Sequence, residues 1–170
     1  MTEPPRLTII IDTGTWLKLD YLHDASLFSP AQVYSWSQVV TSHQVEEELA
    51  RFRCKSFMKI NTRILPVMHT EVYEEARALG FDDADASLAS LGEKDSDTII
   101  VVTEDRPFLD YLELNKISAI QFAELLQIYT DIGKIDGKMF YRLTKELHEC
   151  RNITKHKMND LLKWKAERFR

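Results

Sequence analysis

Short unbroken apolar runs alternate along the chain with longer segments whose apolar residues recur every three or four positions. Residues 7–11 and 98–103 are nearly continuous in Leu, Ile, Val and Thr. Unbroken runs of this length are typical of strands buried on both faces of a parallel sheet. Shorter strands are predicted at 36–40, 63–67 and 117–120, and Pro66 places the strand at 63–67 on a sheet edge.

Helical spacing fills the intervals between these strands. Ser29 and Pro30 form an N-cap followed by a first-turn proline, and Thr41 with Gln44 forms a capping-box pattern. Asp82 is suited to cap a further helix. Helices are predicted through residues 16–22, 30–34, 45–52, 72–79, 83–91, 107 onwards, 122–129, 140–150 and 158–169. The alternation predicts a parallel-sheet α/β domain followed by a helical C-terminal extension.

Composition narrows the class of protein. The 170 residues are 44% hydrophobic, which suits one compact domain with a real core. No apolar stretch approaches the roughly 20 residues that span a bilayer, and the N-terminus lacks the pattern of a signal peptide. Cys54 and Cys150 stand alone, so the spacing argues against a disulfide framework or a structural zinc site. We expect a cytoplasmic protein with no membrane association.

Charge is unevenly distributed about a net value of −5. Residues 71–97 hold nine acids against Arg77 and Lys94, whereas the last twenty residues hold seven Lys and Arg against two acids. A basic tail on an acidic body suggests contact with nucleic acid, for which the sequence offers Lys163, Lys165 and Arg168, with Arg106 elsewhere in the chain. The alternative is a solvated helix face, and Trp164 among these cations fits either a base-stacking or a packing role.

Four acids occupy comparable places in the predicted elements. Asp12 and Asp105 follow the two buried strands, while Glu48 and Asp85 lie in the first turns of helices. Ligand sites of parallel sheets lie at the carboxyl ends of the strands. Carboxylate oxygens suit Mg²⁺ and Mn²⁺, which promote phosphodiester hydrolysis by charge neutralisation and activation of water. The chain has no Gly-rich phosphate loop, HExxH or GxSxG motif, so these acids are the candidate catalytic and metal-binding residues.

Each acid also has a purely structural interpretation. Acids at a helix start stabilise the helix dipole or cap its first turn, which would account for Glu48, Asp85, Asp12 and Asp105 separately. The register is open as well, because other acids stand close to the four candidates in sequence. These neighbours are Glu46, Glu47, Asp82, Asp83 and Glu104. Asp97 precedes its strand and should lie at the opposite edge of the sheet.

Four short motifs together resemble those of PIN-domain nucleases. The segments are Ile-Ile-Asp-Thr-Gly at 10–14, Val-Glu-Glu-Glu-Leu at 45–49, Asp-Ala-Ser-Leu-Ala at 85–89 and Thr-Glu-Asp-Arg at 103–106. Their order and approximate spacing agree with that family over residues 7–125. Gly92 and Glu93 interrupt the helix that is usually Ala-rich, which leaves Asp82 and Asp83 as substitutes for Asp85.

The resemblance implies a three-layer α/β/α fold around a central parallel sheet of five strands. We therefore expect a PIN-like nuclease domain at residues 1–130 and a helical extension at 131–170 packed on the same domain. It also implies a metal-dependent endoribonuclease similar to VapC toxins, with Mg²⁺ or Mn²⁺ held by Asp12, Glu48, Asp85 and Asp105. Thr13, Thr103 and Glu104 would support these acids. An antitoxin protein and a homodimer are the partners that the family implies besides RNA.

Rival interpretations differ in the chemistry they need. A haloacid-dehalogenase-like phosphatase requires a second aspartate two residues after Asp12, where Gly14 stands. A response-regulator receiver requires paired acids at the first strand and a lysine at the last, and neither pattern is clear. The remaining alternative is a catalytically inactive PIN-like module that binds RNA or a protein.

Overall fold

The computed structural model describes residues 6–170 and contains a five-stranded, all-parallel sheet. The strands are β1 (Thr8–Ile11), β2 (Gln38–Ser42), β3 (Thr62–Leu65), β4 (Ile99–Val102) and β5 (Ala119–Ile120). Their order across the sheet is β3-β2-β1-β4-β5. The fold is therefore the predicted α/β class, and the strand beginning at Thr62 lies at a sheet edge as Pro66 indicated.

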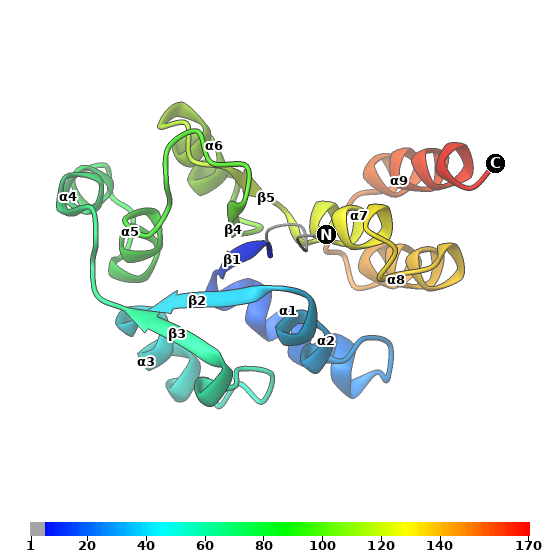
Figure 1. Ribbon diagram of the computed structural model, residues 1–170, viewed down its shortest axis with the longest axis horizontal. Coiled ribbons are helices and arrows are strands. Elements are labelled where there is room, and N and C mark those ends of the chain that lie inside the picture. The colour runs from blue at the N-terminus through cyan, green and yellow to red at the C-terminus, as the bar shows by residue number, and fades with distance from the viewer. Residues whose placement is uncertain (1–5) are drawn as a thin grey trace, which may run out of the picture. The chain divides into compact units, whose positions relative to one another are not determined.

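The helices follow the strands in alternation. Those that precede β5 are α1 (Thr13–Asp24), α2 (Pro30–Trp36), α3 (His43–Arg51), α4 (Thr70–Ala78), α5 (Asp83–Ala89) and α6 (Arg106–Leu114), with a short 3-10 turn η1 at Lys59–Asn61. Figure 1 shows α1, α2 and α3 on one side of the sheet and α4, α5 and α6 on the other. From β1 to β3 the chain adds strands in one direction across the sheet, and it then crosses back to add β4 on the other side of β1. Because crossovers between parallel strands are right-handed, this reversal places the later helices on the opposite face of the sheet.

The core of this part of the molecule consists of the central strands and the helix faces that cover them. Ile9, Ile10 and Ile11 of β1 are buried, as are Val101 and Val102 of β4. Burial of the unbroken apolar runs on both faces explains why they do not alternate with polar residues. Trp16 is fully buried and stacks on Tyr34 with ring centroids 5.8 Å apart.

Two local predictions need correction. Trp36 was predicted to begin a strand, but it is the last residue of α2, and β2 begins at Gln38. Thr41 was predicted to cap the next helix, but Thr41 is in β2 and the N-cap of α3 is Ser42, whose Oγ accepts from the backbone N–H of Val45 at 3.2 Å. Pairing of β2 with β3 extends the strand to Ser42, which moves the helix start by one residue.

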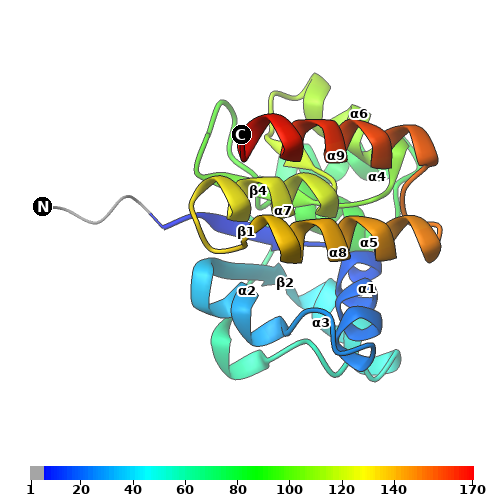
Figure 2. The same ribbon diagram turned by 90° about the vertical axis from the view of Figure 1, so that its right-hand side faces the viewer.

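The chain divides by compactness into residues 1–122, here called the sheet unit, and residues 123–170, here called the helical unit. The helices at the C-terminal end are α7 (Phe122–Asp131), α8 (Gly137–Glu149) and α9 (Lys155–Arg168). Figure 2 shows α7, α8 and α9 side by side, from yellow to red. No helix within residues 6–170 is both long enough and apolar enough to cross a membrane.

Internal packing of the helical unit assigns a role to Trp164. Its ring lies 5.1 Å from that of the buried Phe140, centroid to centroid, so α8 and α9 pack through an aromatic pair. Leu143 and Leu147 of α8 and Leu161 of α9 are also buried. Trp164 thus serves packing, the second of the two roles considered for it.

Candidate active site

The carboxyl ends of β1 and β4 are adjacent, and Asp12 leaves the first of them. Ile11 pairs with Val102 in the parallel register, and the backbone N–H of Asp12 donates to the carbonyl of Val102 at 3.1 Å. The Asp12 carboxylate accepts from the Thr103 hydroxyl and, at 2.8 Å, from the backbone N–H of Thr15 at the start of α1. Asp12 is therefore both the N-cap of α1 and a buried acid at the point where the strand order reverses.

Glu48 reaches the same region from α3. The Thr13 hydroxyl, one residue after Asp12, donates to Glu48 Oε2 at 2.5 Å. Ser42, the N-cap of α3, fixes where this helix begins and hence the position of Glu48 in its second turn. Through this hydrogen bond, Thr13 connects the segment that follows β1 to α3, the helix that follows β2.

Asp85 lies in the first turn of α5, directly above its N-cap Asp82. The Asp82 carboxylate accepts from the backbone N–H of Asp85 at 2.8 Å. Two residues after Asp85, the buried Ser87 hydroxyl donates to Ser42 Oγ at 2.7 Å. This bond joins the middle of α5 to the N-terminus of α3, so the sequence-distant Glu48 and Asp85 belong to helices in direct contact.

Asp105 completes the set as the N-cap of α6. Its Oδ1 accepts from the backbone N–H of Phe108 at 2.8 Å, and its own backbone N–H donates to Thr103 Oγ1 at 3.1 Å. Thr103 therefore contacts both Asp12 and Asp105. Asp105 is exposed, whereas Asp12 is 8% exposed.

Electrostatics provide the clearest sign that these acids share one site. Burial, followed by the negative charges of nearby carboxylates, raises the pKa of Asp85 to about 7. The carboxylates that act on Asp85 are Asp82, Asp12, Asp105 and Glu48. Burial also raises the pKa of Asp12, against the hydrogen bonds from Thr103 and Thr15 and with a further contribution from Asp105. The charges of Asp12, Asp105 and Glu48 therefore all reach Asp85, and the charge of Asp105 also reaches Asp12.

Two of the acids that stand close in sequence to the four candidates are paired with other side chains. Asp83 accepts a hydrogen bond from the Tyr73 hydroxyl, and Glu46 lies 2.6 Å from Lys59 Nζ. Glu47 is exposed. Asp97 precedes β4 and therefore lies at the opposite end of that strand from Asp105. The neighbour whose charge acts on Asp85 is Asp82.

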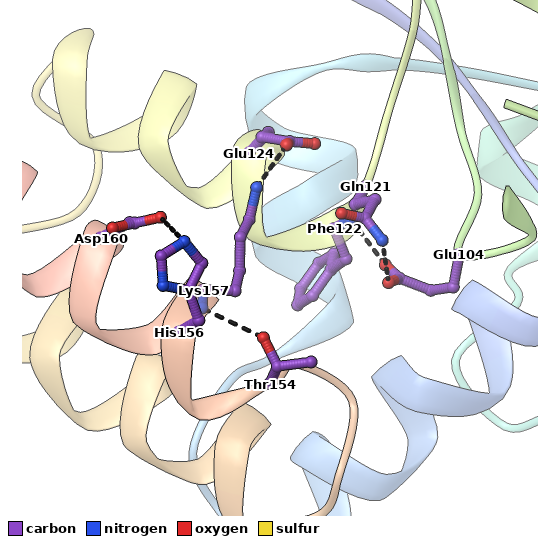
Figure 3. Close-up of polar contacts among 8 residues, drawn as sticks. All are labelled: Glu104, Gln121, Phe122, Glu124, Thr154, His156, Lys157 and Asp160. Atoms are coloured by element: carbon purple, nitrogen blue, oxygen red, sulfur yellow. Dashed lines mark hydrogen bonds and ion pairs between the residues drawn. The ribbon is translucent and has the colours of Figure 1, made fainter. Parts of the chain in front are cut away.

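Glu104 points to the start of α7, as Figure 3 shows. Its Oε1 accepts from the backbone N–H of Phe122 at 2.7 Å, and its Oε2 lies 3.5 Å from Gln121 Nε2. The side chain thus stabilises the first turn of α7. Its predicted role in supporting the acids stays a prediction.

The acids at this edge of the sheet have the ligand chemistry of a metal site but not its coordination geometry. The donors are carboxylate and hydroxyl oxygens, the ligand type of Mg²⁺ and Mn²⁺, and their mutual repulsion would be relieved by a cation. Across residues 6–170, however, no three His, Cys, Asp or Glu side chains are arranged so as to hold a metal ion. The residues therefore fit a hard divalent ion by type and location, and binding would require side-chain movement.

The cations predicted to contact RNA belong to two units of the chain, Arg106 to the sheet unit and the other three to α9 of the helical unit. Arg106, exposed at the start of α6, forms an ion pair with Asp110 at 3.2 Å. In the helical unit, Arg168 pairs with Asp131 at 3.0 Å, and Lys165 Nζ lies 5.4 Å from the ring centroid of Tyr141. Lys163 is exposed on α9.

Two serines of the site were not foreseen. Ser42 and Ser87 carry the bond between α3 and α5, and both are buried. Serine before a helix is a recognisable N-cap, so Ser42 had a signal that the competing Thr41 pattern obscured. Ser87 in mid-helix had none, because only the fold brings it to Ser42.

No model of a known protein family matches the chain, and no curated protein is significantly similar to it in sequence. The functional argument therefore depends on the residues and the geometry described above.

Proposed function

We propose that the chain is a metal-dependent endoribonuclease of the PIN-domain type. One observation carries the proposal: the charges of Asp12, Glu48 and Asp105 all act on Asp85, although the four residues come from four separate parts of the chain. Helix capping accounts for Asp12 and Asp105 individually, but it does not explain why the four acids converge on one edge of the sheet. Clustered acids cost stability, and a cation-dependent reaction is a reason to retain them.

In this proposal, the threonines and the acids of the site have different roles. Thr103 and Thr13 orient the Asp12 and Glu48 carboxylates through their hydroxyls. When bound at these four acids, Mg²⁺ or Mn²⁺ supplies charge neutralisation for a phosphodiester and activation of water for in-line attack. The products expected from such hydrolysis are a 3′-hydroxyl and a 5′-phosphate.

Among the three candidates for the third acid, the structure favours Asp85. Asp83 is bonded to Tyr73, and both Asp82 and Asp83 are exposed. Asp85 is less exposed than either and responds to the charge of every other acid in the set. We assign the third position to Asp85.

The proposal is tested by cleavage of varied single-stranded RNAs with Mg²⁺ or Mn²⁺. Asp12→Asn and Glu48→Gln should leave the fold intact and reduce cleavage by about two orders of magnitude or more, as loss of a charge-stabilising group does. Glu47→Gln, one residue from Glu48 and exposed, is the matched control and should retain activity. Equal cleavage by wild type and Asp12→Asn would refute the assignment.

A second candidate function is a module of the same fold that binds RNA or a protein without cleaving it. The observation in its favour is that no three acids within residues 6–170 already form a metal-binding group. The two functions differ in one experiment: RNA binding by the wild type with no cleavage in either metal favours the module. An antitoxin partner, a homodimer and a cytoplasmic location belong to the nuclease proposal as VapC-like expectations.

A further inference from the structure

The helical unit differs in charge from the rest of the chain. Residues 123–170 hold eleven Lys and Arg and seven Asp and Glu, a net charge of +4, whereas residues 1–122 have a net charge of −9. A polyanion would be repelled by the acidic sheet unit and attracted to the helical unit. Where it would bind depends on which of these cations are accessible and unneutralised.

Two α9 cations, Lys157 and Arg168, are poorly suited to bind an anion because each is paired with an acid. Lys157 Nζ lies 2.6 Å from Glu124 Oε1, and His156 pairs with Asp160 at 3.2 Å; both contacts appear in Figure 3. Lys157 is also only about one third exposed. The first turns of α9 are thus partly neutralised by the unit's own acids.

The opposite end of α9 meets the start of α8 in a different environment. A side-chain atom on Gly137 would lie 3.3 Å from both Lys165 Cε and the Phe169 ring, so the two helices are in close contact there. Lys165 Nζ lies 5.4 Å from the Tyr141 ring centroid. The Arg168 guanidinium lies 5.7 Å from the Phe169 ring centroid, but it is already paired with Asp131 at 3.0 Å. Cations and aromatic rings are therefore interleaved at this junction.

Two further cations extend this surface along α8. Lys138 and Arg142 are exposed and stand four residues apart, so they share one face of the helix with Tyr141 beside them. We call the resulting surface the α8–α9 patch. It consists of Lys138, Tyr141, Arg142, Lys165 and Phe169.

The exposed aromatic rings are what distinguish this patch from an ordinary solvated helix face. Tyr141 is 44% exposed and Phe169 is 47% exposed, while the apolar side chains that hold the helices together are buried elsewhere on α8 and α9. Cations that follow a phosphate backbone, combined with rings on which bases stack, are the means by which proteins bind single-stranded nucleic acid. A purely acidic protein partner would use the cations but not the rings.

We infer that the α8–α9 patch binds single-stranded RNA, with Tyr141 and Phe169 stacking bases. Its three cations, Lys138, Arg142 and Lys165, would contact phosphates. The choice of RNA rests on the proposed function of the sheet unit, whereas the binding surface is independent of the acids there. The patch supplies the attraction for a polyanion that the sheet unit lacks.

The test measures binding of labelled oligouridine to the full chain in EDTA, where metal-dependent cleavage plays no part. The double variant Lys138→Gln with Arg142→Gln should weaken binding and lower the slope of log affinity against log salt by roughly 0.7 for each phosphate that the variant no longer neutralises. Lys155→Gln is the matched control, because Lys155 is exposed on α9 about 15 Å along the helix from Lys165. It should change binding little.

Tyr141 provides a second, charge-independent measurement. Tyr141→Ala should weaken binding about fivefold or more, as expected when one base–aromatic stack is removed, and should leave the salt slope unchanged. Tyr141→Phe retains the ring and should bind like the wild type. Circular dichroism of each variant establishes that it is folded.

Two results would overturn the inference. One is oligouridine binding that is unaffected by both the Lys138/Arg142 double variant and Tyr141→Ala. The other is polyglutamate binding as tight as oligouridine with no effect of Tyr141→Ala, which would identify a surface for an acidic protein. Since neither measurement involves cleavage, their outcome is separate from that of the nuclease assay.

Discussion

The side chain of Asp12, at the end of a buried strand, has several structural roles at once. It caps α1, accepts from Thr103 and is only 8% exposed, and burial raises its pKa. Capping alone does not require burial, because N-cap carboxylates serve equally well at the surface. The buried position is therefore better explained by the site than by the helix.

Thr103→Val is expected to weaken this arrangement without leaving a cavity. Valine has nearly the shape of threonine but donates no hydrogen bond, so the buried Asp12 carboxylate loses a partner. The free energy of unfolding should fall by about 1–3 kcal/mol, measured by urea denaturation. Thr103→Ser retains the hydroxyl and should lose less. A Thr103→Val variant as stable as the wild type would contradict this role of the hydrogen bond.

Asp85 is expected to make stability depend on pH in metal-free solution. Its pKa rises from the usual 3.8 to about 7 in the folded chain. Between these values the folded state binds more protons than the unfolded state, so the free energy of unfolding falls as pH rises through this window. Asp85→Asn removes the group and should flatten the fall, as urea denaturation in EDTA at pH 5 and pH 8 would measure.

Asp83→Asn is the matched control for that experiment. Asp83 is two residues away on the same helix turn, and its carboxylate is bonded to Tyr73 instead. This variant should keep the pH dependence of the wild type. The same dependence in Asp85→Asn would contradict the raised pKa.

Sequence patterns predicted the acids as individuals better than their surroundings. Asp12 and Asp105 could be located because each ends an unbroken apolar run, and Asp82 could be recognised as an N-cap. The Ser42–Ser87 hydrogen bond could not, since residues 45 positions apart give no local signal of contact. Partners in a site are set by tertiary packing, which a single sequence does not display.

At the scale of elements, the bond between Ser42 and Ser87 joins α3 to α5. Ser87→Ala should lower the free energy of unfolding by about 1 kcal/mol or more, because the variant lacks the buried contacts of this hydroxyl with Ser42 Oγ and with the Ala84 carbonyl. It should also reduce cleavage if the proposed nuclease depends on where Glu48 and Asp85 are held. Ser35→Ala, at an exposed serine of α2, should change stability by no more than about 0.5 kcal/mol. Comparable losses in both variants would remove the special role of the bond between α3 and α5.

Element boundaries shifted where two signals competed. Thr41 and Ser42 are both good N-cap residues, and Gln44 favoured the first. Parallel pairing of Ser42 with Leu65 keeps Thr41 in β2, so the strand overrides the capping pattern. The strong apolar runs at β1 and β4 had no competing signal, and their predicted bounds differ from the structure by one residue at each changed end.

At the scale of the whole molecule, the class of fold was predictable and the strand order was not. Alternating strand and helix patterns indicate a parallel α/β domain, because parallel strands need crossover helices. The order β3-β2-β1-β4-β5 depends on which strands pair across the sheet, and no local pattern records it. That order places β1 beside β4, which is what brings Asp12 to Asp105.

A divalent cation bound among the four acids is expected to stabilise the folded chain. If divalent ions bind among the four acids, Mn²⁺ should raise the unfolding temperature in calorimetry, by an amount that corresponds to about 2.7 kcal/mol at one hundred times Kd. The increase should be larger at pH 8 than at pH 5.5, because Asp85 is ionised only above its pKa of about 7.

A non-specific effect of a charged surface is the competing explanation, since residues 1–122 have a net charge of −9. Asp12→Asn and Asp97→Asn remove the same charge from opposite ends of the sheet. Binding among the four acids predicts that the Mn²⁺ effect is lost in Asp12→Asn and retained in Asp97→Asn. An equal Mn²⁺ effect in the two variants would mean that the ion associates with the acidic surface as a whole, and the nuclease proposal would lose its metal site.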